Sequence, residues 1–234
     1  MTEPEWSTTR LREALADRLT PQADDWLRGR LAAAAAGPEA VRTAFPGAAR
    51  HGGRGDLQPA GRGGGADHPL ARWQVEDAVR TLLLAALPLR GEALVAELTA
   101  LYRGGDTAER RAVLRALSVL DHRTTDEQLP GAGPYGLGDG ALPLVRDALR
   151  TNDLRLIAAA LGDYAARRLD QAAWRQAVLK CVFTGVPLAL VAGLADRADT
   201  ELLRMLDDFG TERRAAGRAV PADIESVLHA HRVS

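Results

Sequence analysis

Lys180 is the one lysine among the 30 basic residues of the chain, and it lies in a segment with few other charges. Gln176 precedes it by about one helical turn in AWRQAVLK, so the amide and the ammonium share one face of a helix. An ammonium is a compact point charge, which the planar fork of an arginine does not replace. Lys180 with Gln176 is therefore predicted to bind an anion, and a catalytic role for Lys180 as an amine nucleophile stays open.

A structural role for Lys180 is the alternative. A charged amine in apolar surroundings must be paired, lose its proton or face a polar cavity. An ion pair inside the protein would meet this need as well as a ligand would. The sequence offers three carboxylates for such a pair, Asp163, Asp196 and Asp207.

Two further groups of residues could hold an anion. Arg111 and Arg115 lie at positions i and i+4 of a helix face, and Arg150-Thr151-Asn152 lies where one predicted helix ends and the next begins. Arginine beside a helix N-terminus is a good site for phosphate or carboxylate. The alternative is that these arginines are solvated and that Asn152 is an ordinary helix cap.

Trp174 is predicted to be a core residue or, alternatively, a platform on which a ligand stacks. Cys181 lies in the same apolar segment and is predicted to be an inert core residue. The histidines form neither an HExxH motif nor an i, i+4 pair. We therefore expect no catalytic metal, and the sequence indicates no other cofactor.

These side chains need elements to position them, and the chain reads as helical almost throughout. Residues 170–185 form its central segment, with Asp170 as the predicted N-cap and Gly185 as the C-terminal stop. The residues between them leave no polar stripe wide enough for a solvent face, which is typical of a helix covered on every side. Further helices are predicted at about 8–19, 21–36, 38–45, 69–88, 90–102, 107–121, 142–150, 153–161, 188–196, 200–216 and 221–231.

Helix starts recur at a nearly constant spacing. Asp106, Asp153 and Asp199 each open a helix, 47 and 46 residues apart. Such a period, with two helices per unit, is the spacing of HEAT and armadillo repeats. The predicted fold class is all-α, with antiparallel helix pairs stacked as a short HEAT/armadillo-like right-handed solenoid. We expect a single domain over residues 1–234, with a flexible Gly-rich loop at 47–67 and an irregular segment at 124–140.

Length and composition exclude several classes of protein. A chain of 234 residues can bury a full core, and its net charge of −1 argues against a nucleic-acid partner. No apolar run is long enough to span a membrane, and the acidic N-terminus is unlike a signal peptide. The single cysteine excludes an internal disulfide and a cysteine-based zinc site. We expect a soluble, cytoplasmic protein.

Four stretches of the chain resemble the EboA family. The resemblance extends over roughly residues 90–225, with a weaker one around Trp26 and Phe45-Pro46. The chain departs from the family at Arg175, where the family typically has Asn, and at Arg214, where it often has an aromatic residue. The four stretches are ERRAVLRAL (109–117), RTN (150–152), AWRQAVLK (173–180), which is the most specific, and GLADRADTELLRMLDDFGTERRAAGRAVP (193–221).

The resemblance implies a pathway rather than a reaction. Proteins similar to this one are encoded beside a prenyltransferase-like membrane protein, a sugar-phosphate cyclase-like enzyme, a sugar isomerase-like barrel and a metal-dependent hydrolase. This neighbourhood implies the biosynthesis or export of a prenylated, cyclitol-like secondary metabolite. We therefore expect the chain to bind a small, anionic metabolite in a pocket beside the 170–185 helix, and whether it is an enzyme stays open.

Two other functions are compatible with a helical chain of this size. One is a non-enzymatic scaffold that holds partner enzymes of the same pathway. The other is a HEAT-like DNA glycosylase, which the near-zero net charge and the ten aromatic residues argue against.

Overall fold

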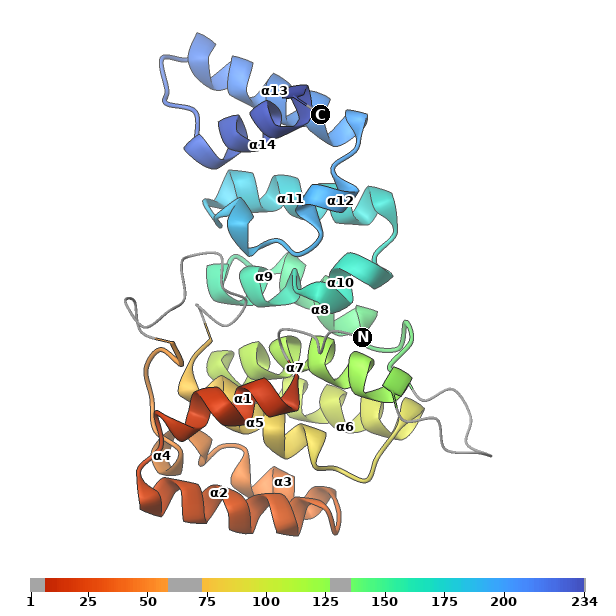
Figure 1. Cartoon of the computed structure of the whole chain (residues 1–234). Helices are drawn as coiled ribbons and strands as arrows, with labels where there is room; N and C mark the ends of the chain where they lie inside the picture. The colour runs from red at the N-terminus through yellow and green to blue at the C-terminus, as the bar shows by residue number, and fades with distance from the viewer. Residues whose placement is uncertain (1–6, 59–72, 127–135, 234) are drawn as a thin grey trace. The chain divides into compact units, whose positions relative to one another are not determined.

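The computed structural model describes residues 7–58, 73–126 and 136–233, and within these ranges the chain is all-helical (Figure 1). These ranges contain fourteen α-helices and one 3₁₀ helix, and one isolated antiparallel bridge links Asp56 to Gln74 in the described residues. The chain divides into two compact units, residues 1–144 and 145–234. The single domain and the solenoid expected from the sequence stay predictions.

Unit 1 contains seven helices in the ranges described, with starts that follow the capping signals of the sequence. The Ser7 hydroxyl accepts a hydrogen bond from the Arg10 N–H, and the Thr20 hydroxyl accepts one from the Ala23 N–H, both at 3.2 Å. The helices are α1 (Thr8–Ala16), α2 (Pro21–Ala34), α3 (Pro38–Ala44), α4 (Ala48–His51), α5 (Val75–Ala85), α6 (Gly91–Gly104) and α7 (Thr107–Asp126).

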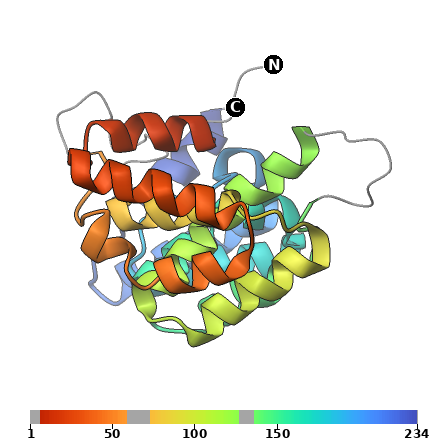
Figure 2. The same ribbon diagram turned by 90° about the horizontal axis from the view of Figure 1, so that it is seen from below.

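The helix covered on every side in unit 1 is α5. Every one of its residues is buried, and it contacts α1, α2, α4 and α7. Figure 2 shows its gold ribbon in the middle of this group. The helix expected over 69–88 begins later than predicted. Trp73 lies in an extended stretch, and its carbonyl oxygen accepts a 2.7 Å hydrogen bond from the Leu57 N–H. Pro69, the predicted first residue of this helix, is outside the described residues.

The Gly-rich segment is more ordered than its composition predicts. Residues 48–51 form α4, and Gly52 after it is packed so closely that a Cβ would lie 2.9 Å from both Ala48 O and Val79 Cγ2. Leu57 is buried. The prediction of a flexible loop is therefore wrong for residues 48–58, because close packing and the bridge to Gln74 hold this stretch. Residues 59–67 of the expected loop are outside the described ranges.

The start predicted for the irregular segment at 124–140 is also too early. Helix α7 extends to Asp126, and residues 127–135 are not described. Leu137 and Ala141, just before α8, are both buried. Apolar anchors therefore hold the end of this connection against its own unit.

The longer helices of unit 2 begin and end close to the predicted residues. Asp170 accepts a hydrogen bond from the Ala173 N–H at 2.8 Å, and Gly185 ends α11 in the left-handed region at φ +79°. The sequence analysis missed α10, and the helix expected at 188–196 is split at Gly193, whose φ is +72°. The elements are α8 (Leu142–Arg150, which spans the boundary between units), α9 (Leu154–Ala160), α10 (Asp163–Arg168), α11 (Gln171–Thr184), η1 (Leu188–Leu190), α12 (Leu194–Arg197), α13 (Thr200–Ala215) and α14 (Ala222–Val233).

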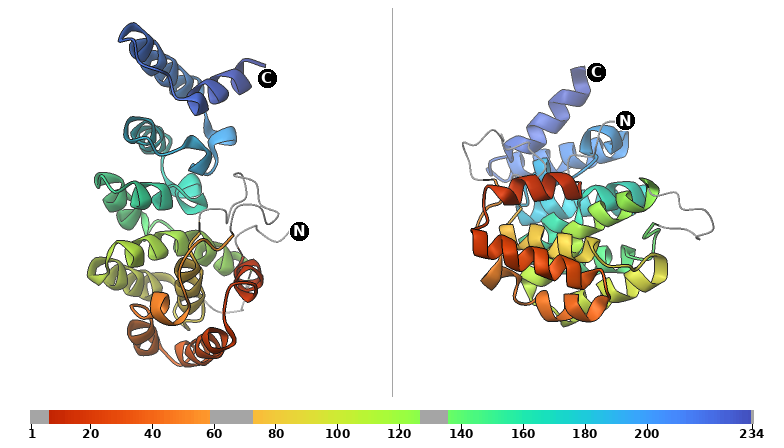
Figure 3. Two further views of the ribbon diagram at one scale, coloured as in Figure 1. Left: turned by 90° about the vertical axis from the view of Figure 1, so that its left-hand side faces the viewer. Right: turned by 60° about the horizontal axis from the view of Figure 1, so that its bottom comes forward.

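Helix α11 is not covered on every side, so this prediction is wrong. Trp174 is completely buried, whereas Gln176 is exposed and Phe183 is 69% exposed on the opposite face. Helices α13 and α14 form a hairpin, joined at Gly217 with φ +68° (Figure 3). No helix in the described ranges has the length and apolar character needed to cross a lipid bilayer.

Candidate functional site

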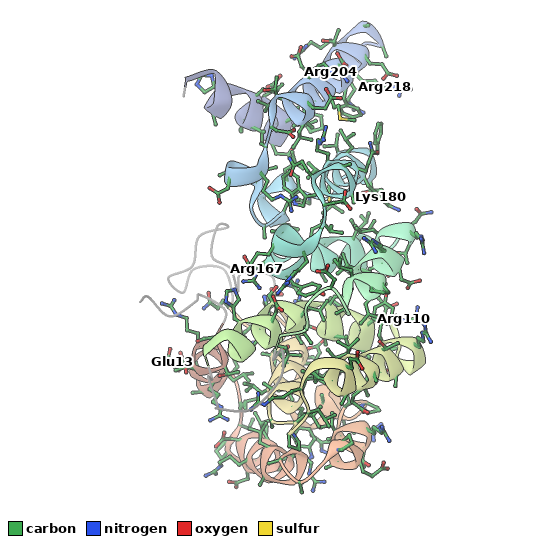
Figure 4. All side chains as sticks on the ribbon, turned by 90° about the vertical axis from the view of Figure 1, so that its right-hand side faces the viewer. Glu13, Arg110, Arg167, Lys180, Arg204 and Arg218 are labelled. Carbon is green, nitrogen blue, oxygen red and sulfur yellow. The ribbon has the colours of Figure 1, made fainter. Side chains whose placement is uncertain are left out.

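The outward face of α11 carries Gln176 and Lys180, as their spacing predicts. Lys180 is half-buried and lies at the outer side of the helix (Figure 4). Its ammonium forms no ion pair with Asp163, Asp196 or Asp207, nor with any other residue in the described ranges, and Asp163 pairs instead with Arg167 at 2.8 Å. The expectation that Lys180 is enclosed in the core is wrong, since the face of α11 on which it lies is open.

Trp174 lies on the inward face of α11, away from Gln176 and Lys180. Its ring is fully buried, and the Arg197 guanidinium lies over it, 4.8 Å from the ring centroid. The indole Nε1 has no hydrogen-bond partner in the described residues. This position is that of a core residue, so Trp174 is not part of the surface formed by Gln176 and Lys180.

Arg197 explains why Trp174 is enclosed. Its guanidinium donates to the carbonyl oxygens of Ala166 and Leu169 at the end of α10 and to Oε1 of Gln171 at 2.9 Å. Gln171 in turn donates to the Arg197 carbonyl at 2.8 Å and to the Asp199 carboxylate at 2.9 Å. Burial lowers the pKa of Arg197. The sequence analysis did not identify this network, because its members come from three separate segments.

An aromatic pair begins about one helical turn after Lys180, with Phe183 exposed and Phe209 half-buried. Phe183 lies on the same face of α11 as Gln176 and Lys180, and its ring meets that of Phe209 on α13 edge-to-face, with centroids 5.1 Å apart. The Arg213 guanidinium lies 5.6 Å from the Phe209 ring centroid on the same helix. Neither Lys180 nor Arg213 pairs with a carboxylate in the described residues. This cation–aromatic strip, Lys180, Phe183, Phe209 and Arg213, was not predicted as a unit.

In unit 1 the two arginines expected to hold an anion already contact carboxylates of the chain. Arg111 Nε lies 3.0 and 2.9 Å from the two carboxylate oxygens of Asp77, and its Nη2 donates to Glu76 at 3.2 Å. Arg115 Nε lies 3.3 Å from the same Asp77, and its guanidinium covers the Trp73 ring at 5.4 Å. These pairs account for Arg111 and Arg115 without a ligand, and a ligand role for them stays a prediction.

Arg80 completes this buried charge cluster on α5. It donates from Nε to the Phe45 carbonyl at 3.0 Å, and its Nη1 has no partner within the described ranges. Burial lowers the pKa of Arg80, while the charges of Glu109, Asp77, Asp106 and Glu76 oppose that shift. The sequence analysis overlooked this cluster because charged residues on an amphipathic-looking helix are normally solvated.

Arg150 and Asn152 are both exposed at the end of α8, in unit 2. The cap of α9 is Asp153, which accepts from the Arg155 N–H at 2.9 Å and was predicted as a helix start, so the alternative that Asn152 is an ordinary helix cap is wrong. Thr151 donates to the Ala148 carbonyl at 2.8 Å and closes the end of α8.

The predicted site residues therefore divide into separate groups. Arg111 and Arg115 are in unit 1, whereas Arg150, Asn152, Trp174, Gln176 and Lys180 are in unit 2. Within unit 2, Gln176 and Lys180 share the outward face of α11, whereas Arg150 and Asn152 are exposed at the end of α8.

Unit 2 also has an open pocket of about 550 Å³ between α13 and α14. None of the residues predicted for the site lines it. Its lining residues are Arg214, Ala222, Glu225, Ser226, Leu228 and His229.

Cys181 is fully buried, as expected for a core cysteine. Burial raises the pKa of its thiol to about 12, with a smaller contribution from Asp223. In the part of the chain that the structure describes, no three His, Cys, Asp or Glu side chains are grouped so that they could hold a metal ion.

Comparison with known proteins supports the resemblance read from the sequence. The model of the EboA family, described as metabolite traffic protein EboA, matches residues 7–229. The match extends across both units rather than the C-terminal part alone. No curated protein and no solved structure matches the chain. The chain belongs to the EboA family.

Proposed function

We propose that the protein binds a small, anionic metabolite through the face of α11 that carries Gln176 and Lys180, as one step in the traffic of that metabolite. The observation that carries the proposal is Lys180, a half-buried residue whose ammonium no carboxylate neutralises in the described residues. An unpaired cation on a partly buried side chain is a ready contact for an anion. The family description of metabolite traffic supports the same class of function.

The neighbouring residues favour an anion over a neutral ligand. Gln176, one turn before Lys180, can donate and accept hydrogen bonds. The strip continues through Phe183 and Phe209 to Arg213, a second cation without a carboxylate partner in the described residues. We propose that this anionic ligand belongs to a pathway for the biosynthesis or export of a prenylated, cyclitol-like secondary metabolite.

We further propose that the helix pairs stack as a HEAT-like solenoid. The support for this arrangement is the nearly constant spacing of the helix starts in the sequence.

Binding of defined anions tests the proposal. The probes are inositol 1-phosphate and geranyl diphosphate, with inositol and geraniol as their uncharged counterparts, measured by calorimetry and thermal shift. A charged probe is expected to bind and to raise the melting temperature, since a ligand of the folded state stabilises it. Lys180→Met should weaken this binding about tenfold or more. Charged and uncharged probes that bind equally, or a Lys180→Met protein that binds like the wild type, would refute it.

A scaffold role is the second candidate, and the exposure of Phe183 favours it. A phenyl ring that is 69% exposed is not enclosed by a small-molecule pocket. Aromatic residues and arginine are enriched in protein interfaces, where they account for much of the binding energy. Phe183→Ser should then abolish the association with a partner enzyme and leave binding of inositol 1-phosphate, which has no apolar chain, unchanged, which separates the two candidates.

A further inference from the structure

The pocket between α13 and α14 is lined by charged and polar groups that have no ion-pair partner. Arg214 comes from the last turns of α13, and Glu225, Ser226 and His229 come from α14. Arg214 and Glu225 form no ion pair with each other or with any other residue that the structure describes. A guanidinium and a carboxylate therefore line one cavity without neutralising one another.

The Arg214 side chain lies over the preceding turn of its own helix. The space above Gly210, one turn earlier, is occupied by the Arg214 side chain, because a Cβ at Gly210 would lie 3.5 Å from Arg214 Nη2 and 3.6 Å from Val220 Cγ1. Arg213 donates to the Ala219 carbonyl at 2.6 Å, and the Arg218 N–H donates to the Arg213 carbonyl at 2.8 Å. These bonds hold the turn that joins the two helices.

Helix α14, which forms the other side of the pocket, is hydrogen-bonded to η1. Asp223, in the first turn of α14, accepts a hydrogen bond from the Leu188 N–H of η1 at 2.9 Å. Ser226 donates to the Ala222 carbonyl at 3.0 Å, so its oxygen keeps lone pairs for a ligand. Leu228 is buried and supplies an apolar floor. The pocket thus has an apolar base at Leu228 and side chains of opposite charge on its two helices, Arg214 on α13 and Glu225 on α14.

We infer that this pocket is a second binding site, separate from the α11 face, for a small zwitterion. Its anionic group would pair with Arg214 and its ammonium group with Glu225. A molecule with both charges satisfies both side chains at once, whereas a simple anion leaves the carboxylate of Glu225 facing a like charge. A volume of about 550 Å³ is in the usual range for a small-molecule site.

The experiment measures binding of four probes by isothermal titration calorimetry. Phosphoethanolamine and 4-aminobutyrate carry both charges and differ in their anionic group, whereas inorganic phosphate and ethanolamine carry one charge each. At least one of the two zwitterions should bind about tenfold or more tightly than either single-charge probe, and comparing the two shows whether the site prefers phosphate or carboxylate. Arg214→Gln and Glu225→Gln should each remove that preference.

Controls make the result specific to this pocket. Arg218→Gln changes an exposed arginine of the same turn that does not line the pocket, and it should bind all four probes as the wild type does. Lys180→Met should also leave zwitterion binding unchanged, so failure of the α11 proposal and failure of this one are distinguishable. Arg214 and Glu225 are exposed, so their variants are expected to fold. The inference is overturned if no probe binds at 10 mM (about the weakest affinity that calorimetry resolves) or if Arg214→Gln binds zwitterions like the wild type.

Discussion

Arg111 on α7 holds Asp77 on α5, with its Nε 2.9 and 3.0 Å from the two oxygens of a carboxylate that is completely buried. The same guanidinium reaches Glu76 through Nη2. The charge of Asp77 is thus neutralised inside the protein, and the contact joins the central helix of unit 1 to its longest neighbour. A residue that the sequence suggested for ligand binding has a structural partner.

Removal of Arg111 should destabilise unit 1 strongly. Arg111→Met leaves Asp77 with Arg115 as its only ion-pair partner among the described residues, and breaking a buried ion pair costs about 3–5 kcal/mol. Urea denaturation followed by circular dichroism measures the loss. Arg103→Met, at an exposed position on α6, is the matched control and should unfold like the wild type. An Arg111→Met protein as stable as this control would show that the pair does not support the fold.

Removal of the Lys180 ammonium, unlike removal of Arg111, should leave the stability of the protein almost unchanged. It is half-buried and has no ion pair with a described residue, so Lys180→Met is expected to change the free energy of unfolding by no more than about 0.5 kcal/mol. Thermal and urea denaturation measure this. A loss of several kcal/mol would mean that the ammonium has a structural partner, and would remove the argument for an open anion contact.

Arg197 should stabilise unit 2 through the end of α10. Arg197→Lys keeps the charge but cannot reproduce the donors that bind the Ala166 and Leu169 carbonyls and Gln171. We expect a loss of about 1–3 kcal/mol from partly buried acceptors left unpaired. Urea denaturation provides the measurement, with Arg218→Lys at an exposed position of the turn between α13 and α14 as the control that stays unchanged. Equal stability of the two variants would contradict this role.

Cys181 should be protected from alkylation. Its thiol is buried and its pKa is raised to about 12, so the reactive thiolate is scarce at neutral pH. At pH 8, iodoacetamide should react at least roughly a hundredfold more slowly with the folded protein than with the urea-unfolded chain. Because the folded protein keeps the thiol protonated to higher pH than the unfolded chain, this contribution to stability is complete below pH 9.0 and is lost as the pH rises toward about 12. Rapid labelling at pH 8 would place the thiol at the surface.

Helix ends were predictable from the sequence because capping is local. Asp170, Asp153 and Asp199 accept N–H bonds within two or three residues of themselves, so each signal lies in one short stretch of chain. The missed helix α10 follows α9 after only a short break, and its six residues are too few for a periodic pattern.

The site was harder to predict because burial depends on partners far away in the sequence. The charges of α5 suggest a solvated face, yet they are buried because Arg111 approaches from α7, 34 residues away. The apolar residues of α11 suggest a fully enclosed helix, but Phe183 remains exposed and meets Phe209 from α13. Composition alone does not decide which apolar face of a helix packs against another element.

The most direct measurement uses the fact that the chain has a single lysine. Reductive ¹³C-methylation adds one dimethyl-lysine signal from Lys180, which is distinguished from that of the terminal amine by its absence in the Lys180→Met protein. Titration with inositol 1-phosphate or geranyl diphosphate, followed by NMR, should shift this signal in a saturable way, whereas inositol and geraniol should leave it in place. A Lys180 signal that stays unmoved while calorimetry detects binding of the same probe would contradict the account.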